Sequence, residues 1–281
     1  MKRCFAFFAA LTLMLTPSLT SNVNAQGSVR VPIIMYHKVS TNSGLWGKYC
    51  ITPDELESDL EYLHDNDYEI ITITDLISYV HYGVDLPKNP IVLTFDDGNY
   101  SDYRYVYPLL QKHNTRAVIS IIGQITDEYT LENRQDIHYP SLTWFQISEM
   151  MNSGLVELQN HGYNLHCERS GVRGAAKQSG ESEEDYFNRL KGDVAKLQNR
   201  ALEKTGLTPN TFTYPFGAYS PESDSIIEQL GFYASLICEE KTNVLTVGDE
   251  KCLYGLGRIL RPHGANPGTF FEEIDVAYVI E

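Results

Sequence analysis

The chain has 281 residues, of which 42% are hydrophobic and 21% are charged, and its formal net charge is −15 at pH 7. Nucleic acids and anionic lipids or polymers bind to basic protein surfaces. The strongly acidic balance of this chain therefore argues against a nucleic-acid partner and against docking on anionic lipids or anionic polymers. A neutral or cationic substrate fits this charge better, and the length suits one domain or one barrel.

The first 25 residues have the pattern of a secretory signal peptide. Lys2 and Arg3 form a short basic start, and the apolar run CFAFFAALTLMLT follows. This run is too short to span a bilayer comfortably, and the small-residue sequence VNA ends at Ala25. The pattern predicts export to the cell envelope or the medium with cleavage after Ala25, no stable membrane insertion, and a mature domain over residues 26–281. The alternative is a retained N-terminal anchor.

Strand-like and helix-like segments then alternate along the chain. Apolar and β-branched runs predict strands over residues 31–37, 69–73, 91–95, 117–122, 155–161, 211–217 and 232–237. Capping residues and apolar steps of three or four predict helices over residues 52–66, 75–83, 103–114, 143–154, 182–206, 221–231 and 268–277. Pro108 predicts a break in one helix, and the Gly- and Ser-rich segment 167–182 predicts a long loop. The alternation implies parallel βαβ units, which close either as a barrel or as a doubly wound sheet.

Two predicted strands end in polar residues that could form one site. Asp96 and Asp97 follow the buried run IVLTF, although an ordinary Asp-Gly surface turn would also explain them. His161 and His166 follow another strand, at a five-residue spacing that suits a turn better than a helical face. Because parallel strands end on one rim, a carboxylate and two imidazoles there can hold a divalent metal and leave positions open for water and substrate. The neighbouring aspartate then remains available as a base. The alternative is a pair of ordinary surface-loop histidines.

Three motifs carry a resemblance to a known family. TFDDG, NHGYNLH and TYPFG, in this order, resemble the signature of polysaccharide deacetylases, the NodB-homology or carbohydrate esterase family 4 proteins, and the likeness covers most of residues 31–240. It implies an α/β fold, a distorted (β/α)7 barrel of the NodB-homology type. It also implies an exported, metal-dependent hydrolase that removes N-acetyl groups from an acetylated amino-sugar polymer such as peptidoglycan, a chitin-like chain or poly-N-acetylglucosamine. The alternatives are an O-acetyl esterase of the xylan type and a carbohydrate-binding protein without catalysis.

The resemblance also implies roles for single residues. Asp96 matches the catalytic base, and Asp97, His161 and His166 match the metal ligands, usually of zinc. The five-residue histidine spacing resembles the branch that acts on poly-N-acetylglucosamine. The main-chain N–H of Phe216, the aromatic residue of the third motif, would contribute to an oxyanion hole.

The third motif departs from the family pattern, because Thr213 stands where an arginine normally holds the base. The late segment GRILRPHG offers two arginines and a histidine, and strand alternation would place residues 259, 261 and 263 on one face. We therefore predict that Arg261 pairs with Asp96, that His263 protonates the leaving amine, and that Arg258 is dispensable.

Two further features leave alternatives open. His37, at the end of the first strand, either lines the site or is a structural histidine of the rim. Four cysteines follow the predicted signal peptide, namely Cys50, Cys167, Cys238 and Cys252. Their spacing contains no Cys-x-x-Cys, which argues against a zinc ribbon and leaves up to two disulfides whose pairing the sequence does not determine.

Overall fold

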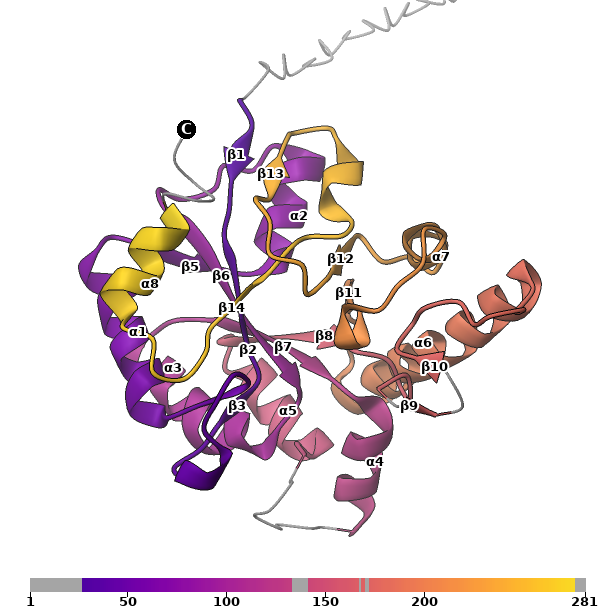
Figure 1. Cartoon of the computed structure of the whole chain (residues 1–281), viewed down its shortest axis with the longest axis horizontal. Coiled ribbons are helices and arrows are strands. Elements are labelled where there is room, and N and C mark those ends of the chain that lie inside the picture. The colour runs from indigo at the N-terminus through magenta and orange to yellow at the C-terminus, as the bar shows by residue number, and fades with distance from the viewer. Residues whose placement is uncertain (1–26, 133–140, 167, 170–171, 276–281) are drawn as a thin grey trace, which may run out of the picture.

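The computed structural model describes residues 27–132, 141–166, 168–169 and 172–275. The predicted signal peptide and Cys167 lie outside these residues. In Figure 1 the strands gather at the centre of the molecule and the helices surround them.

One parallel sheet forms the centre of the fold. Its main path has the spatial order β12 (Ala234–Leu236), β11 (Thr211–Thr213), β8 (Val156–Asn160), β7 (Ala117–Ile121), β6 (Pro90–Asp97), β2 (Ile33–Tyr36) and β14 (Ile259–Leu260). A further strand, β5 (Glu69–Ile71), pairs in parallel with the start of β6, where Glu69 lies opposite Pro90. The seven strands of the main path curl into a half-barrel, which confirms the predicted (β/α)7 fold of the NodB type over the doubly wound sheet.

Short strand pairs lie outside this sheet. They are β1 (Val29–Arg30) with β13 (Val244–Leu245), β3 (Lys38–Val39) with β4 (Cys50–Ile51), and β9 (Glu168–Arg169) with β10 (Val172–Arg173). The last pair is a short antiparallel hairpin inside the segment 167–182, where the sequence predicts a long loop.

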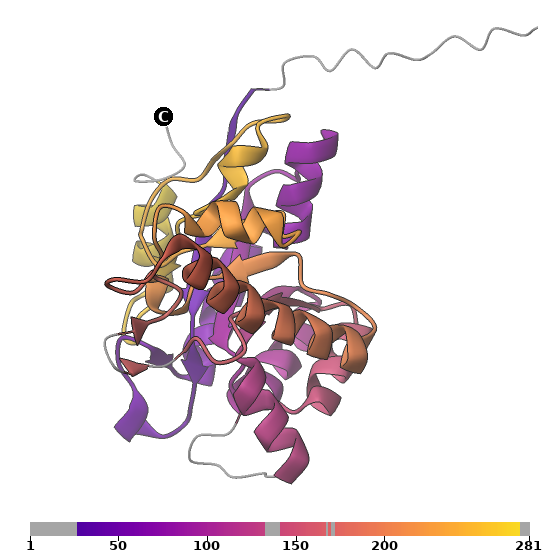
Figure 2. The same cartoon turned by 90° about the vertical axis from the view of Figure 1, so that its right-hand side faces the viewer.

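Helices connect the strands and cover the sheet. They are α1 (Pro53–Asp65), α2 (Ile73–Tyr82), α3 (Tyr107–His113), α4 (Gly123–Glu132), α5 (Trp144–Asn152), α6 (Glu183–Thr205), α7 (Ser223–Gln229) and α8 (Pro267–Ile274). Thr52, Thr72 and Thr143 each begin a helix with a capping box, in which a side chain on the first turn bonds back to the threonine N–H. Figure 2 shows α6, the longest helix, crossing the near side of the molecule.

The helices of the structure differ from the predicted ones in two places. Helix α4 was not predicted, because GQITDEYTLE carries only a weak apolar periodicity. The predicted helix 103–114 consists of a π-helical turn, η2 (Asp102–Val106), followed by α3, and Pro108 lies in the first turn of α3, as the break predicted there requires.

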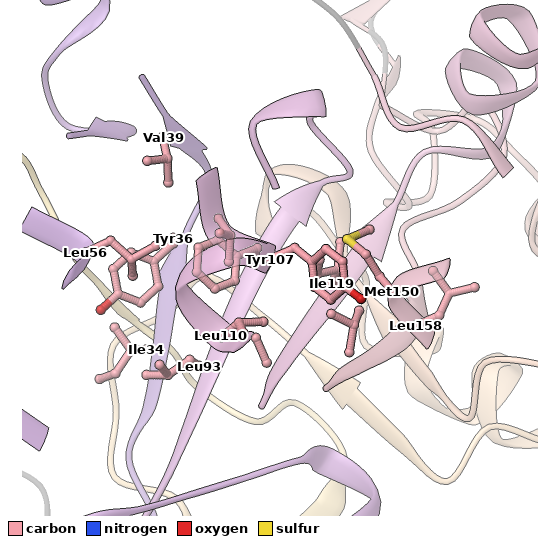
Figure 3. Close-up of a cluster of buried hydrophobic side chains, with 14 of the residues drawn as sticks. Ile34, Tyr36, Val39, Leu56, Leu93, Tyr107, Leu110, Ile119, Met150 and Leu158 are labelled. Carbon is pink, nitrogen blue, oxygen red and sulfur yellow. The ribbon is translucent and has the colours of Figure 1, made fainter. Parts of the chain in front are cut away.

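The two faces of β6 show how the core positions the site. Ile91, Leu93 and Phe95 pack into the hydrophobic cluster between the sheet and the surrounding helices, part of which Figure 3 shows around Leu93, Tyr107 and Ile119. The intervening residues of β6 face the opposite way, into the barrel, and Asp96 is one of them. The alternation of a single strand therefore directs this carboxylate into the interior.

None of the helices within the described residues has both the length and the apolar character needed to cross a bilayer.

Candidate functional site

A cavity of about 930 Å³ opens at the carboxyl ends of the parallel strands. His37 follows β2, Asp96 and Asp97 end β6, and His161 follows β8. Phe216, Cys238 and Leu260 come from the ends of β11, β12 and β14 in the same way. Active sites lie at this end of parallel α/β barrels, so this cavity is the candidate active site.

Asp96 is buried in this cavity and is held by Arg258. The two guanidinium nitrogens of Arg258 donate to Oδ1 and Oδ2 of Asp96 at 2.7 and 2.8 Å. The Nε atom of Arg258 donates to the Ile237 carbonyl at 3.0 Å, and both side chains are almost fully buried, with 0% exposure for Arg258 and 1% for Asp96. Planar, two-pronged pairing of this kind fixes the orientation of a carboxylate.

The charge state of Asp96 follows from the same contacts. Burial alone would raise its pKa, but the charges of Arg258 and His161 and the Arg258 hydrogen bonds outweigh burial and hold the pKa well below its usual range. Asp96 is therefore ionised at neutral pH.

The prediction that Arg261 holds Asp96 was wrong. Arg261 donates from Nε and a terminal nitrogen to both oxygens of Asp59 on α1, at 2.8 to 3.2 Å, and Tyr36 donates to the same carboxylate at 3.0 Å. Arg258 and Arg261 do lie on opposite faces, as strand alternation requires. The faces were assigned the wrong way round, because Arg258 points into the barrel and Arg261 points to the helix layer.

The prediction that His263 lies near the reacting nitrogen was also wrong. Strand β14 ends at Leu260, so its alternation does not extend to residue 263. The Nδ1 atom of His263 lies 2.8 Å from Oε2 of Glu55, and its ring lies 5.1 Å from that of Trp46, between centroids. His263 is not among the residues that line the cavity.

The three predicted metal ligands come together. Oδ1 of Asp97 lies 3.6 Å from Nε2 of His161 and 3.3 Å from Nε2 of His166, and these three atoms lie within 4.8 Å of one another. Oδ1 of Asp97 is buried and has no hydrogen-bond partner among the described residues. Ligand atoms about 2.0–2.2 Å from a tetrahedral ion are separated by roughly 3.3–3.6 Å, so this donor set fits a divalent metal.

A backbone carbonyl on the neighbouring strand β11 determines which nitrogen of His161 carries the proton. Its Nδ1 lies 2.8 Å from the carbonyl oxygen of Thr213. A carbonyl only accepts, so Nδ1 carries the proton and Nε2 presents its lone pair toward Asp97. Burial lowers the pKa of His161 despite the nearby carboxylates, which favours the neutral imidazole that a metal requires.

Thr213 has a structural position that explains the absent arginine. Its hydroxyl lies 2.7 Å from that of Ser120 on β7, and both residues are fully buried. An arginine from β11 is not needed here, because Arg258, directly before β14, already binds Asp96.

Phe216 lies beside His166, one of the three predicted metal ligands. Its ring centroid is 4.1 Å from that of His166, and its backbone adopts a left-handed conformation with φ 59°. A non-glycine residue in this region is strained and is found disproportionately at functional sites. The role of its N–H in an oxyanion hole stays a prediction.

Of the two alternatives for His37, lining the site or supporting the rim, the structure favours the first. His37 lines the cavity, and its Nε2 lies 3.9 Å from Oδ2 of Asp96. In the sequence, His37 directly follows a buried strand, as Asp96 and His161 do. This position distinguishes His37 from the surface histidines.

The cysteines contribute no disulfide among the described residues. Cys50, Cys238 and Cys252 are free thiols, and Cys167 lies outside the described part of the chain. Sγ of Cys238 lies 3.7 Å from a terminal nitrogen of Arg258, and burial raises the pKa of the Cys238 thiol.

Comparisons with known proteins agree with this geometry. The family model described as polysaccharide deacetylase matches residues 83–235. The poly-β-1,6-N-acetyl-D-glucosamine N-deacetylase of Escherichia coli K12 is 26% identical over 223 residues, which are 71% of this chain and 32% of that protein. The chain thus spans about a third of the length of this relative.

Solved structures share the fold. IcaB from Ammonifex degensii superposes with a TM-score of 0.69 at 26% identity, covering 88% of this chain and 96% of that one. A de-N-acetylase from Aggregatibacter actinomycetemcomitans gives a TM-score of 0.70 at 24% identity, covering 86% of this chain and 99% of the other.

Proposed function

Because this chain belongs to the polysaccharide deacetylase family, we propose that it is a metal-dependent hydrolase that removes N-acetyl groups from a polymer of N-acetylglucosamine. One observation carries the proposal. Three ligand atoms face one another at the wall of a cavity, and next to them lies an ionised carboxylate that Arg258 holds by both oxygens. The name of the Escherichia coli relative supports a poly-N-acetylglucosamine substrate.

Asp97, His161 and His166 would hold the divalent ion, and zinc suits a set of one carboxylate and two imidazoles. When bound, such an ion polarises the acetamide carbonyl and acidifies a water molecule. The Thr213 carbonyl keeps His161 in the tautomer that can bind it.

Asp96 is the proton acceptor in this mechanism. As the attacking water forms its bond to the acetyl carbon, one Asp96 oxygen takes the water proton. Arg258 holds the Asp96 carboxylate in one orientation, so the reaction does not have to include the entropy cost of orienting it. The Phe216 N–H donates to the acetyl oxygen as that oxygen gains negative charge.

His37 is the proton donor for the leaving nitrogen. The C–N bond breaks only if this nitrogen gains a proton, and the products are then acetate and a free glucosamine unit. Among the described residues that line the cavity, the histidines are His37, His161 and His166, and the last two serve as the ligands. His37 is thus the histidine left for this step, in place of His263.

Acetate release tests the proposal and separates it from its alternatives. Purified protein should release acetate from N-acetylglucosamine oligomers, lose this activity with a chelator and regain it with zinc. Release from acetylated xylan alone would identify an O-acetyl esterase. Folded, zinc-loaded protein that binds the oligomers and releases no acetate would be a carbohydrate-binding protein, and the proposal would be wrong.

We also propose that the protein is exported and that residues 26–281 form its deacetylase domain. The support is the basic start, the short apolar run and the small residues that end at Ala25. Amino-terminal sequencing of the protein from the cell envelope or medium should begin at Gln26, and a chain that retains Met1 would contradict cleavage.

A further inference from the structure

An exposed aromatic side chain, Tyr49, stands at the edge of the cavity. Its exposed fraction is 52%, although it lines the cavity together with His37 and Asp96. Its ring centroid lies 4.9 Å from that of His37 in an edge-on arrangement, with 61° between the planes. Lys48 Nζ lies 5.3 Å from the centre of the Tyr49 ring. A large aromatic left half open to solvent at a cavity edge is free to cover an apolar face of a ligand.

The backbone around Tyr49 is held in place on both sides. Lys48 and Tyr49 form the tip of a turn closed by two hydrogen bonds between Gly47 and Cys50, at 3.0 and 3.3 Å. The Tyr49 carbonyl accepts from the Lys38 N–H, and the Gly47 carbonyl accepts from the His263 N–H, both at 3.1 Å. The ring is thus presented on a pre-formed support, which lowers the entropy lost when a ligand binds.

The position of His37 sets the direction of the substrate. In the proposed function His37 protonates the leaving nitrogen, and that nitrogen belongs to the sugar. The sugar therefore lies on the His37 side of the cavity, and the acetyl group lies toward Asp97 and Phe216. Tyr49 contacts His37 and is the more exposed of the two side chains, so it lies nearer the solvent, where the polymer would continue beyond the reacting unit.

We propose that Tyr49 forms a subsite that stacks on the sugar ring next to the one being deacetylated, so that the enzyme selects oligomers over single sugars. This inference rests on the proposed function. Pyranose rings present C–H groups on one face, and an aromatic ring covers such a face while its hydroxyl stays in water. A cavity of about 930 Å³ lies near the upper end of the range for drug-sized ligands and leaves room for more than one sugar unit.

The test compares Tyr49→Ala with a matched control on substrates of different length. Tyr82 is also a strongly exposed tyrosine, with 76% exposure at the end of α2, and it does not line the cavity, so Tyr82→Ala is the control. Tyr49→Ala should raise the KM for an N-acetylglucosamine tetramer about tenfold, with a much smaller effect on the monosaccharide and with kcat little affected. Tyr49→Phe should recover most of the lost affinity, because it keeps the ring.

Binding of the tetramer to Asp96→Asn protein, measured by calorimetry, separates this inference from the proposed function. Adding Tyr49→Ala in that background should weaken binding about tenfold, whether or not the wild-type protein releases acetate. Equal tetramer affinity with and without the Tyr49 ring would overturn the subsite. A fall in kcat at unchanged KM would overturn it as well, because Tyr49 would then act through His37 rather than on the polymer.

Discussion

Arg258 and Asp96 form a buried, two-pronged ion pair although they stand 162 residues apart in the sequence. Asp96 ends β6, the third strand from one end of the strand order, and Arg258 directly precedes β14, the strand at that end. The late part of the chain thus supplies the group that the third motif lacks at Thr213.

We predict that Arg258→Lys lowers turnover about 10²-fold while metal affinity stays within about twofold. Lysine keeps the positive charge but cannot bind both oxygens, so Asp96 loses its fixed orientation. Acetate release and zinc titration on the same preparation check this. The matched control is Arg261→Lys, the other buried arginine, which should keep its turnover per folded molecule. Equal losses of turnover in both variants would contradict the assignment.

Arg261 is predicted to matter for stability instead. Arg261→Ala leaves the buried Asp59 without its cation, and breaking a buried pair in this way costs about 3–5 kcal/mol of the free energy of unfolding. Urea denaturation measures the loss. The double variant Asp59→Leu with Arg261→Met should recover part of it, since no buried charge then remains unpaired. A loss below about 1 kcal/mol in Arg261→Ala would show that the pair is not a stabilising element.

Thr213 is predicted to support the site through its main chain. Thr213→Val removes the hydroxyl that meets Ser120 and should cost about 1–3 kcal/mol of stability, because the Ser120 hydroxyl remains buried and unpaired. Zinc affinity should change less than about threefold, since the carbonyl that orients His161 is retained. Ser120→Ala combined with Thr213→Val should restore much of the stability. A large loss of zinc affinity would place the side chain itself in the metal site.

Asp127 gives a prediction about pH. It accepts hydrogen bonds from Arg200, from Trp144 Nε1 at 2.7 Å and from the Tyr163 hydroxyl at 3.0 Å. Burial raises its pKa, but these bonds outweigh burial and the net pKa is lowered. A lowered pKa means that the folded state prefers the ionised form, so this contribution is present above the ordinary pKa of an aspartate and is lost as the pH falls through the folded-state value.

Asp127→Asn should therefore lose about 2 kcal/mol at pH 7, and the gap to the wild-type protein should narrow at pH 3. Denaturation curves at the two pH values give the comparison. Glu128→Gln, an exposed acid on the same helix, serves as the control and should show little effect at either pH. A gap that widens toward low pH would contradict the sign.

The sequence predicted the parts of this protein that depend on local patterns. From strand ends, helix caps and the three motifs, the sequence predicted that four residues lie on one rim, because the carboxyl ends of parallel strands meet there. These residues are Asp96, Asp97, His161 and His166. The partner of Asp96 was missed for a different reason. Strand alternation predicts that Arg258 and Arg261 lie on opposite faces, but it does not predict which face is the interior. Strand β14 is only two residues long, so it offers little further pattern to decide this.

His263 and His37 show the same limit. Extending the alternation of β14 placed His263 inside, whereas the chain leaves the sheet after Leu260 and His263 pairs with Glu55. His37 followed a buried strand in the same manner as Asp96, yet whether it reached the cavity depended on how β2 and β6 pair. Such pairings join residues that are distant in the chain, and no local pattern encodes them.

The most direct test of the central claim compares Asp96→Asn with Asp97→Asn for zinc content and acetate release. Asp96→Asn should bind one zinc per chain and lose about 10²–10⁴-fold in turnover, because an amide cannot take the water proton. Asp97→Asn should lose most of its zinc. Zinc loss in Asp96→Asn, or acetate release from it at the wild-type rate, would contradict the assignment of Asp96 as the base beside a metal held by Asp97, His161 and His166.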